Sequence, residues 1–82
     1  MSEPAPILRV TVDTPVYGQD GEKLGKVKEV RGNAFKIETG LFQKDYWLPG
    51  NCIAEAAPDV AVTLIVPKDQ VDNQKIEGPQ AA

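Results

Sequence analysis

Residues 16–30 read VYGQDGEKLGKVKEV, and this stretch decides the class of fold that the chain adopts. Asp20-Gly21 lies between two runs that contain apolar residues, and an Asp-Gly pair supplies the positive φ that tight hairpin turns need. A short strand through Val16 is therefore expected to turn back into a longer strand from Leu24 to Val30. The pattern is typical of a β-hairpin.

The longer strand of this hairpin has an irregular apolar pattern. Strict alternation from Val27 would bury Glu29 and expose Val30, whereas one skipped residue lets both valines face the core. We therefore expect a β-bulge at Lys28-Glu29, with a regular edge strand and one exposed valine as the alternative. Gly25 in the same strand indicates a close approach of another backbone segment.

The rest of the chain carries turn residues at short intervals and lacks the spacing of an amphipathic helix. Further strands are expected at residues 34–39, 46–48, 53–56 and 60–66. The last strand has four aliphatic residues on one face, which we expect to lie in the core. They are Val60, Val62, Leu64 and Val66.

A chain of 82 residues forms one domain at most. We expect a single all-β domain over residues 9–71, a small SH3-like β-barrel of five or six short strands. A turn with one 3₁₀ turn is expected at residues 49–52, and a single helical turn at residues 67–71. Residues 1–8 are expected to be a flexible leader and residues 72–82 a flexible tail.

Composition excludes several kinds of active site. The chain has no His, one Cys and a net charge of −3. Without His, neither a Ser-His-Asp triad nor a Cys-His dyad can form, and one Cys cannot supply a Cys-rich metal site. Cys52 is expected to be a small, inert core residue. We therefore expect no catalytic residue, no bound metal and no cofactor.

The sequence also bears on location. One Cys cannot form an internal disulfide, and residues 1–8 lack the charge and apolar run of a signal peptide. The longest apolar run, residues 60–66, is far shorter than the roughly 20 residues that span a bilayer. A cytoplasmic protein without membrane insertion is expected.

The order of these segments resembles the PRC-barrel superfamily, named after the cytoplasmic domain of the photosynthetic reaction-centre H subunit. The resemblance rests on the Asp20-Gly21 turn followed by Leu24-Gly25-Lys26-Val27. It continues with Tyr46-Trp47-Leu48-Pro49 and with Ile53. The closing run at residues 60–66 is most similar to a bacterial domain-of-unknown-function branch of this superfamily.

This resemblance implies a small, strongly bent barrel of five or six strands. Better-known members, among them a ribosome maturation factor, act by contact with other proteins. The superfamily pattern contains no catalytic residue, so the resemblance implies a binding module.

Aromatic residues are the first candidates for a protein contact. Phe42, Tyr46 and Trp47 lie close together in the sequence, and strand alternation points Tyr46 and Trp47 to opposite sides. An outward aromatic side chain suits a protein contact. The alternative is that the loop containing Phe42, or Val71, covers this side chain.

The outer side of the last strand raises the same question. Ala61 and Ile65 make this side unusually apolar for a solvated surface. We expect a protein partner, a second copy of the chain or the segment after Val71 to cover it.

Basic residues are concentrated on and beside the second and third strands. They are Lys23, Lys26, Lys28, Arg31 and Lys36. One interpretation is a lysine patch for RNA, the ribosome or an acidic partner. The other is that lysines protect exposed strand edges from aggregation, because Glu22, Glu29 and Glu38 interleave with them.

The function expected from these features is that of a non-enzymatic interaction module that binds a protein partner or forms a homodimer. The alternative is an RNA- or ribosome-associated accessory module that uses Lys23, Lys26, Lys28 and Lys36.

Overall fold

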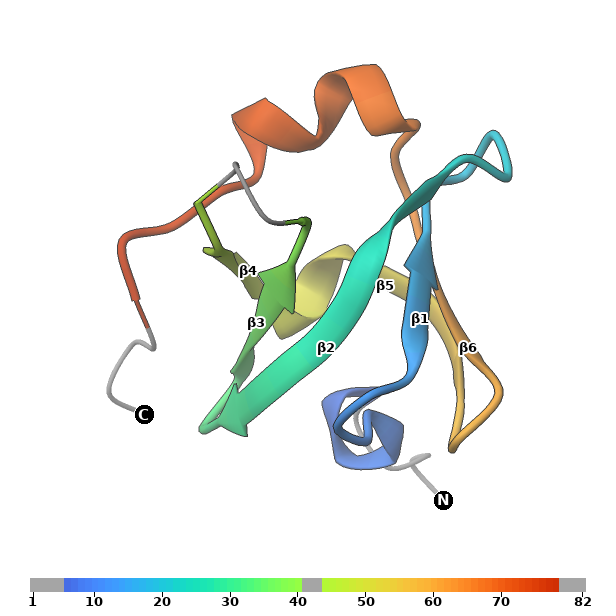
Figure 1. Cartoon of the computed structure of the whole chain (residues 1–82), viewed down its shortest axis with the longest axis vertical. Helices are drawn as coiled ribbons and strands as arrows, with labels where there is room; N and C mark the ends of the chain where they lie inside the picture. Colours follow the sequence, from blue (N-terminus) through green and yellow to red (C-terminus); the bar gives the residue numbers. More distant parts are fainter. Residues whose placement is uncertain (1–5, 41–43, 79–82) are drawn as a thin grey trace.

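The computed structural model describes residues 6–40 and 44–78, and its six strands form one sheet in the order β4-β3-β2-β1-β6-β5 (Figure 1). Neighbouring strands are antiparallel except β1 and β6, which are parallel. The strands are β1 (Pro15–Tyr17), β2 (Lys23–Arg31), β3 (Ala34–Glu38), β4 (Tyr46–Pro49), β5 (Ile53–Ala57) and β6 (Ala61–Leu64).

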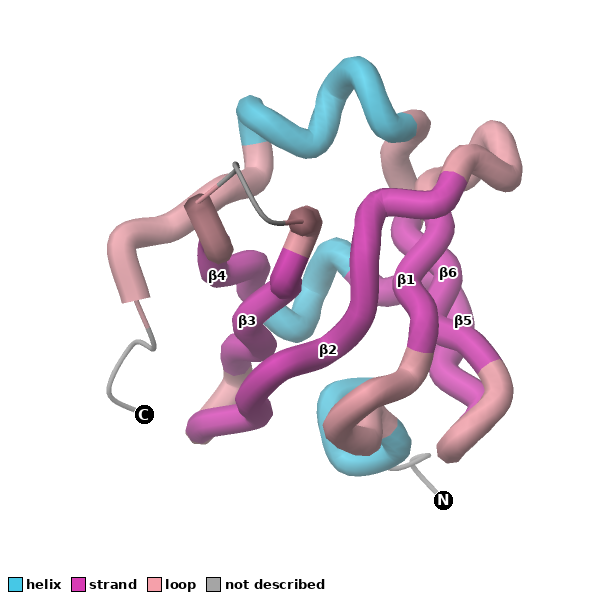
Figure 2. The backbone as a smooth tube through the Cα atoms, viewed as in Figure 1, coloured by secondary structure: helices cyan, strands magenta, loops and turns pink. Residues whose placement is uncertain are grey.

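Short 3₁₀ helices supply the helical structure of the described residues (Figure 2). They are η1 (Pro6–Arg9), η2 (Gly50–Cys52) and η3 (Lys68–Asn73). Helix η1 packs against β5, η2 links β4 to β5, and η3 lies at the opposite end of the molecule from η1 (Figure 1). The expected turn at residues 49–52 contains η2, and the one expected at residues 67–71 overlaps η3, which begins at Lys68 and continues to Asn73, so both helical turns are confirmed.

The sheet is curved but not closed, and this modifies the expected barrel. Strands β4 and β5 stand at the two ends of the strand order, and in the described part of the chain no ladder joins them. Pro49 ends β4 without a backbone N–H, and η2 follows directly, so the chain enters β5 through a helical turn. The small all-β fold of six strands is confirmed, with an open sheet.

The expected β-bulge lies in β2. Val27 pairs with Ile37 of β3, Lys28 has no partner on that strand, and the ladder resumes beyond it. The extra residue lets Val30 pack against the core while Val27 is fully buried. The skipped residue inferred from the apolar pattern is therefore confirmed.

Gly25 allows β2 and β3 to approach closely. Its φ is +157°, and a Cβ built on it would overlap the carbonyl oxygen of Glu38. The expected backbone approach at this glycine is confirmed, and the neighbour is the end of β3.

The core fills the concave side of the sheet. Its large, fully buried side chains are Val16, Val27, Phe35, Ile37, Leu48, Val62 and Leu64. Helices η1 and η3 cover the two ends, each with one buried aliphatic residue, Ile7 and Val71. The strands therefore depend on the two 3₁₀ helices to exclude water from the core.

The predicted last strand needs correction. Strand β6 is shorter than residues 60–66, because Val60 lies in a turn where its N–H donates to Ala57. Asp59 has a φ of +61° there, and Val60 is 67% exposed, so it does not belong to the core. Ile7 belongs to the core although it lies before residue 9. The flexibility of residues 1–8 and 72–82 stays a prediction.

The close approach at Gly25 yields a stability prediction. Gly25→Ala should destabilise the fold by about 2 kcal/mol more than Gly40→Ala, because only the first substitution forces an atomic overlap. Gly40 is a matched control, since its φ is +154° and a Cβ there meets no atom of the described residues within 4 Å. Urea unfolding followed by circular dichroism measures both values. Equal losses would contradict the close approach.

Candidate interaction surface

The outer face of β2, β3 and β4 carries paired charges. Lys26 lies opposite Glu38 on the β2–β3 ladder, and Glu29 lies opposite Lys36. Lys36 also lies over the ring of Trp47, with Nζ 5.8 Å from the ring centroid. Opposite charges and a cation over an aromatic face are favourable cross-strand neighbours.

Lys28, the bulged residue, extends to Asp45. Its Nζ donates a hydrogen bond to Oδ2 of Asp45 over 2.8 Å. This hydrogen bond and the carboxylate charge raise the pKa of Lys28. Two further ion pairs join Lys26 to Asp13 at 3.8 Å and Arg31 to Glu29 at 2.7 Å.

The predicted lysine patch is therefore mixed with acidic groups. The structure brings Lys26, Lys28 and Lys36 together on or beside this face, but each has a carboxylate or an aromatic ring as its neighbour. Exposed pairs of this kind contribute little to stability, because water and salt screen them. Their main effect is to cancel the positive charge that a phosphate backbone would contact.

The two aromatic residues of β4 point to opposite sides, as alternation predicted. Tyr46 packs against the core, and burial raises its pKa to about 12, with the charges of Asp72 and Cys52 as further causes. The Nζ of Lys75 lies 4.3 Å from the centroid of its ring. Tyr46 is therefore half-buried, with one part of its side chain against the core.

Trp47 is half-buried on the other side of β4. Its carbonyl oxygen accepts a hydrogen bond from the N–H of Ile76 over 3.0 Å. The C-terminal segment is therefore the backbone neighbour along the edge of β4 that does not pair with β3. Phe42, the third predicted aromatic contact, lies outside the described residues.

Ala61 and Ile65 lie at the two ends of β6. Ala61 is half-buried, whereas Ile65 follows the strand and is 47% exposed. In the strand order, β3, β2 and β1 separate β6 from β4 and Trp47. The predicted contact residues are thus dispersed over the sheet.

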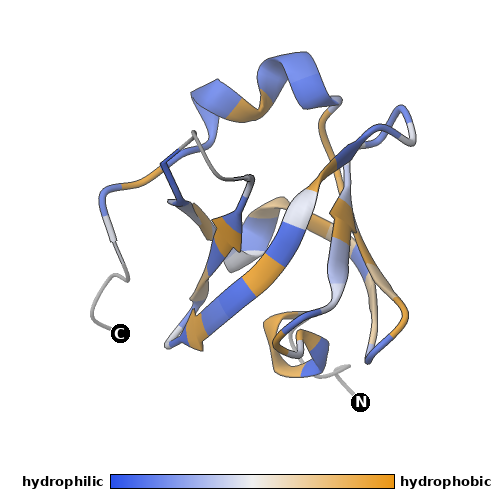
Figure 3. Ribbon diagram, in the orientation of Figure 1, coloured by the Kyte–Doolittle hydropathy of each residue, from blue (hydrophilic) through white to orange (hydrophobic). Residues whose placement is uncertain are grey.

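A second group of exposed aliphatic side chains was missed by sequence reasoning. Leu8 is 74%, Val12 52% and Val60 67% exposed. The backbone N–H of Asp59 donates a hydrogen bond to Oγ1 of Thr11. Asp59 precedes Val60 and Thr11 precedes Val12, so this bond joins the two segments that carry these valines. Figure 3 shows η1 and the β5–β6 turn at the same end of the molecule. We call Leu8, Val12 and Val60 the aliphatic patch.

The sequence held one signal for this patch. Pro58-Asp59 is a turn pair, and Asp tolerates positive φ better than most residues. If the turn predicted at Pro58-Asp59 includes the next residue, Val60 lies in the turn and the strand begins at Ala61. Leu8 carried no such signal, because its exposure depends on how η1 packs against β5.

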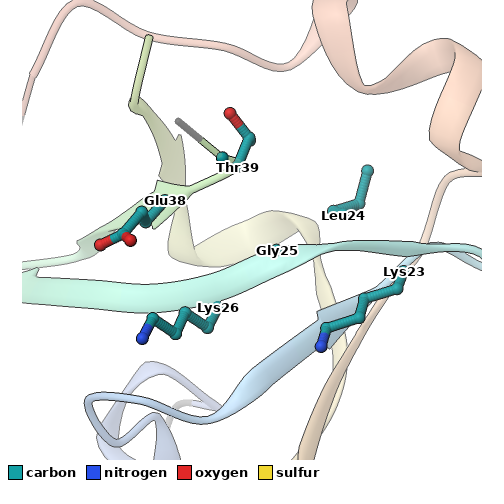
Figure 4. Close-up of a pocket in the computed structure, with 7 residues that line it drawn as sticks. Lys23, Leu24, Gly25, Lys26, Glu38 and Thr39 are labelled. Atoms are coloured by element: carbon teal, nitrogen blue, oxygen red, sulfur yellow. The ribbon is translucent and has the colours of Figure 1, made fainter. Parts of the chain in front are cut away.

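An open cavity of about 410 Å³ lies between β2 and the end of β3 (Figure 4). Lys23 and Lys26 extend from one side of β2, whereas Leu24 extends from the other (Figure 4). Oγ1 of Thr39 is buried and has no hydrogen-bond partner among the described residues. Lys26 and Glu38 lie opposite each other at the wall of this cavity, so their positive and negative charges partly neutralise each other.

Cys52 is fully buried, and burial raises its pKa to about 11. At neutral pH the thiol therefore stays protonated, which is the unreactive form. Within residues 6–40 and 44–78, no three His, Cys, Asp or Glu side chains gather closely enough to hold a metal ion. No helix of the described chain has the length and apolar composition needed to cross a membrane.

The two raised pKa values predict a loss of stability at alkaline pH. An unfolded chain ionises Cys52 and Tyr46 at their ordinary pKa values of 9.0 and 10.0, whereas the folded chain retains both protons to about 11 and 12. The folded state therefore binds more protons over this range. Its stability should be intact below pH 9.0 and should fall as pH rises through the two higher values.

Urea unfolding at neutral and alkaline pH measures this loss. A variant with Cys52→Ala and Tyr46→Phe lacks both titrating groups and should lose less stability than the wild type between the two conditions. An equal loss would show that other groups cause the alkaline unfolding.

Comparison with known proteins identifies the family of this chain. A family model described as an uncharacterized protein conserved in bacteria, DUF2171, matches residues 10–72. The matched range contains all six strands and η2 and excludes η1. No curated protein matches the chain. The likeness to a bacterial domain of uncharacterised function is thereby confirmed, and the chain belongs to the DUF2171 family.

Proposed function

We propose that the protein is a non-enzymatic interaction module that binds a protein partner, or a second copy of itself, through the aliphatic patch. The observation that carries this proposal is the exposure of Leu8, Val12 and Val60, each more than half accessible at one end of the molecule. Exposed apolar side chains at one end of a small domain are typical of a protein-binding surface when they lie together.

The surroundings of the patch support a protein ligand. Arg9, Asp13 and Asp59 are exposed next to the three aliphatic residues in the sequence. An apolar centre with a polar rim is the usual composition of a protein interface. Burying one aliphatic side chain of this size contributes about 1.5–3 kcal/mol, so three of them supply a useful driving force.

We also propose that the chain belongs to the PRC-barrel superfamily. The Asp20-Gly21 turn, the close approach at Gly25 and the curved sheet support it. The superfamily resemblance implies action by contact, which agrees with a binding surface. A cytoplasmic location stays a prediction.

The RNA- or ribosome-associated alternative has less support. Lys28 is paired with Asp45, and Lys26 and Lys36 lie opposite Glu38 and Glu29. A surface for phosphate contacts would need these cations free of neighbouring carboxylates.

Val60→Asp tests the aliphatic patch, because it places a charge at the centre of the proposed interface. We expect it to weaken binding about tenfold or more and to change the free energy of unfolding by less than about 0.5 kcal/mol. Ile65→Asp is the matched control, since it adds the same charge to an exposed aliphatic residue outside the patch.

Sedimentation equilibrium of the three proteins measures self-association. If the wild type is monomeric, the immobilised proteins are compared for what they retain from a bacterial lysate. A Val60→Asp variant that behaves like the wild type in both assays contradicts the patch. A loss confined to Ile65→Asp would restore the surface at Ile65 expected from the sequence.

A further inference from the structure

Strand β4 stands at one end of the strand order, so only one of its two edges pairs with another strand, β3. The strand is short and uncharged, and it reads Tyr46-Trp47-Leu48-Pro49. Aromatic and aliphatic residues favour strand pairing, and an edge that carries them is a template for the strands of other chains. An open sheet that ends in this strand therefore requires protection of the edge.

Pro49 protects one end of this edge. The carbonyl oxygen of Trp47 accepts a hydrogen bond from outside the β3–β4 ladder, and alternate residues of a strand direct their backbone groups to the same side. Pro49, two residues later, therefore faces the same edge, where it offers no N–H. Trp47 thus carries the one N–H of β4 that faces this edge.

The C-terminal segment covers the edge at Trp47. After η3 the chain runs past β4, and Ile76 pairs with Trp47 in an isolated antiparallel bridge (Figure 1). The N–H of Ile76 donates to the carbonyl oxygen of Trp47 over 3.0 Å. The bridge and Pro49 together therefore leave little of the edge open to another strand.

Charged side chains accompany the bridge. Nζ of Lys75 lies 4.3 Å from the ring centroid of Tyr46 and 2.6 Å from Oδ1 of Asp72. Glu77 follows Ile76 and is exposed. Charges beside an edge oppose pairing with a further strand, because that strand would remove them from water. The segment therefore brings to β4 the charges that the strand itself lacks.

We propose that residues 72–78 are an edge guard, a segment whose bridge to Trp47 prevents β4 from pairing with the strands of other molecules. The opposite end of the sheet supports this interpretation, because η1 packs against β5 there. Each end of the open sheet thus has a cover from the same chain. The inference concerns β4 alone and does not rest on the function proposed for the aliphatic patch.

Few contacts hold the edge guard, so a single substitution can release it. None of residues 72–78 is buried. Gln74 has a helical conformation, with φ −104° and ψ −10°, which stops strand pairing on the N-terminal side of the bridge. One bridge is the extent of the pairing that the structure shows between this segment and β4. Its loss would uncover the backbone of Trp47 and leave the core in place.

Two proline variants of the full chain test the edge guard by sedimentation equilibrium. Ile76→Pro removes the N–H that donates to Trp47. Glu77→Pro is the matched control, because it keeps that N–H and favours an extended conformation at Ile76. Ile76→Pro should raise the constant for self-association about tenfold or more over that of the wild type, whereas Glu77→Pro should not.

A second substitution in the Ile76→Pro variant shows which surface associates. Trp47→Glu adds a charge to the edge, and Lys36 lies directly opposite on β3 as a partner for that charge. It should return association to the wild-type level. Val60→Asp should leave the gain unchanged, because Val60 follows β5, at the opposite end of the strand order from β4.

Amide hydrogen exchange of the wild type tests the bridge without any variant. Relative to the rates of an unfolded chain, the N–H of Ile76 should exchange about tenfold more slowly than the N–H of Glu77, because the N–H of Ile76 donates to Trp47.

Circular dichroism first establishes that the variants fold, and the exchange measurement decides alone if Ile76→Pro does not. The edge guard is overturned if the N–H of Ile76 exchanges as fast as that of Glu77. It is also overturned if Ile76→Pro associates no more than the wild type, or if Glu77→Pro gains as much. A gain that persists with Trp47→Glu, or that Val60→Asp abolishes, contradicts it as well. The last result would support self-association through the aliphatic patch.

Discussion

Strand β2 pairs with β1 along one side and with β3 along the other, and two irregularities make this possible. Against β1 the register shifts between Gly25 and Lys23, and against β3 it shifts at Lys28. Each extra residue bends the strand and increases its twist. Because Gly25 has no side chain, the bent strand can lie directly against the backbone of Glu38. The curvature that encloses the core depends on this close contact.

The same curvature separates two kinds of surface. The outer face of β2 and β3 alternates Lys26, Glu38, Glu29 and Lys36, so its charges neutralise one another. The ends of the curved sheet are closed by short helices, which leave aliphatic side chains exposed near η1. The aliphatic patch that we propose as a contact surface therefore lies at one end of the molecule, away from the charged face.

Much of the fold could be predicted because strands report their buried face through alternation. The bulge at Lys28 followed from the two valines that flank it, and the turn at Asp20-Gly21 from its residue types. The candidate surface was less accessible. Val60 continued an apolar alternation and was assigned to the core, but the turn at Asp59 removes it from the ladder. A local pattern cannot show which end of an apolar run enters the sheet.

The sequence by itself determined the all-β class, the strand positions near the hairpin, the bulge and the absence of histidine chemistry, because each depends on residue type or on neighbours close in the chain. Only the tertiary structure decided that the sheet stays open, that Ile7 enters the core and that Ile76 reaches Trp47. These features join residues far apart in the chain. Their outcome depends on the space left by the packed sheet, and no local pattern encodes that space.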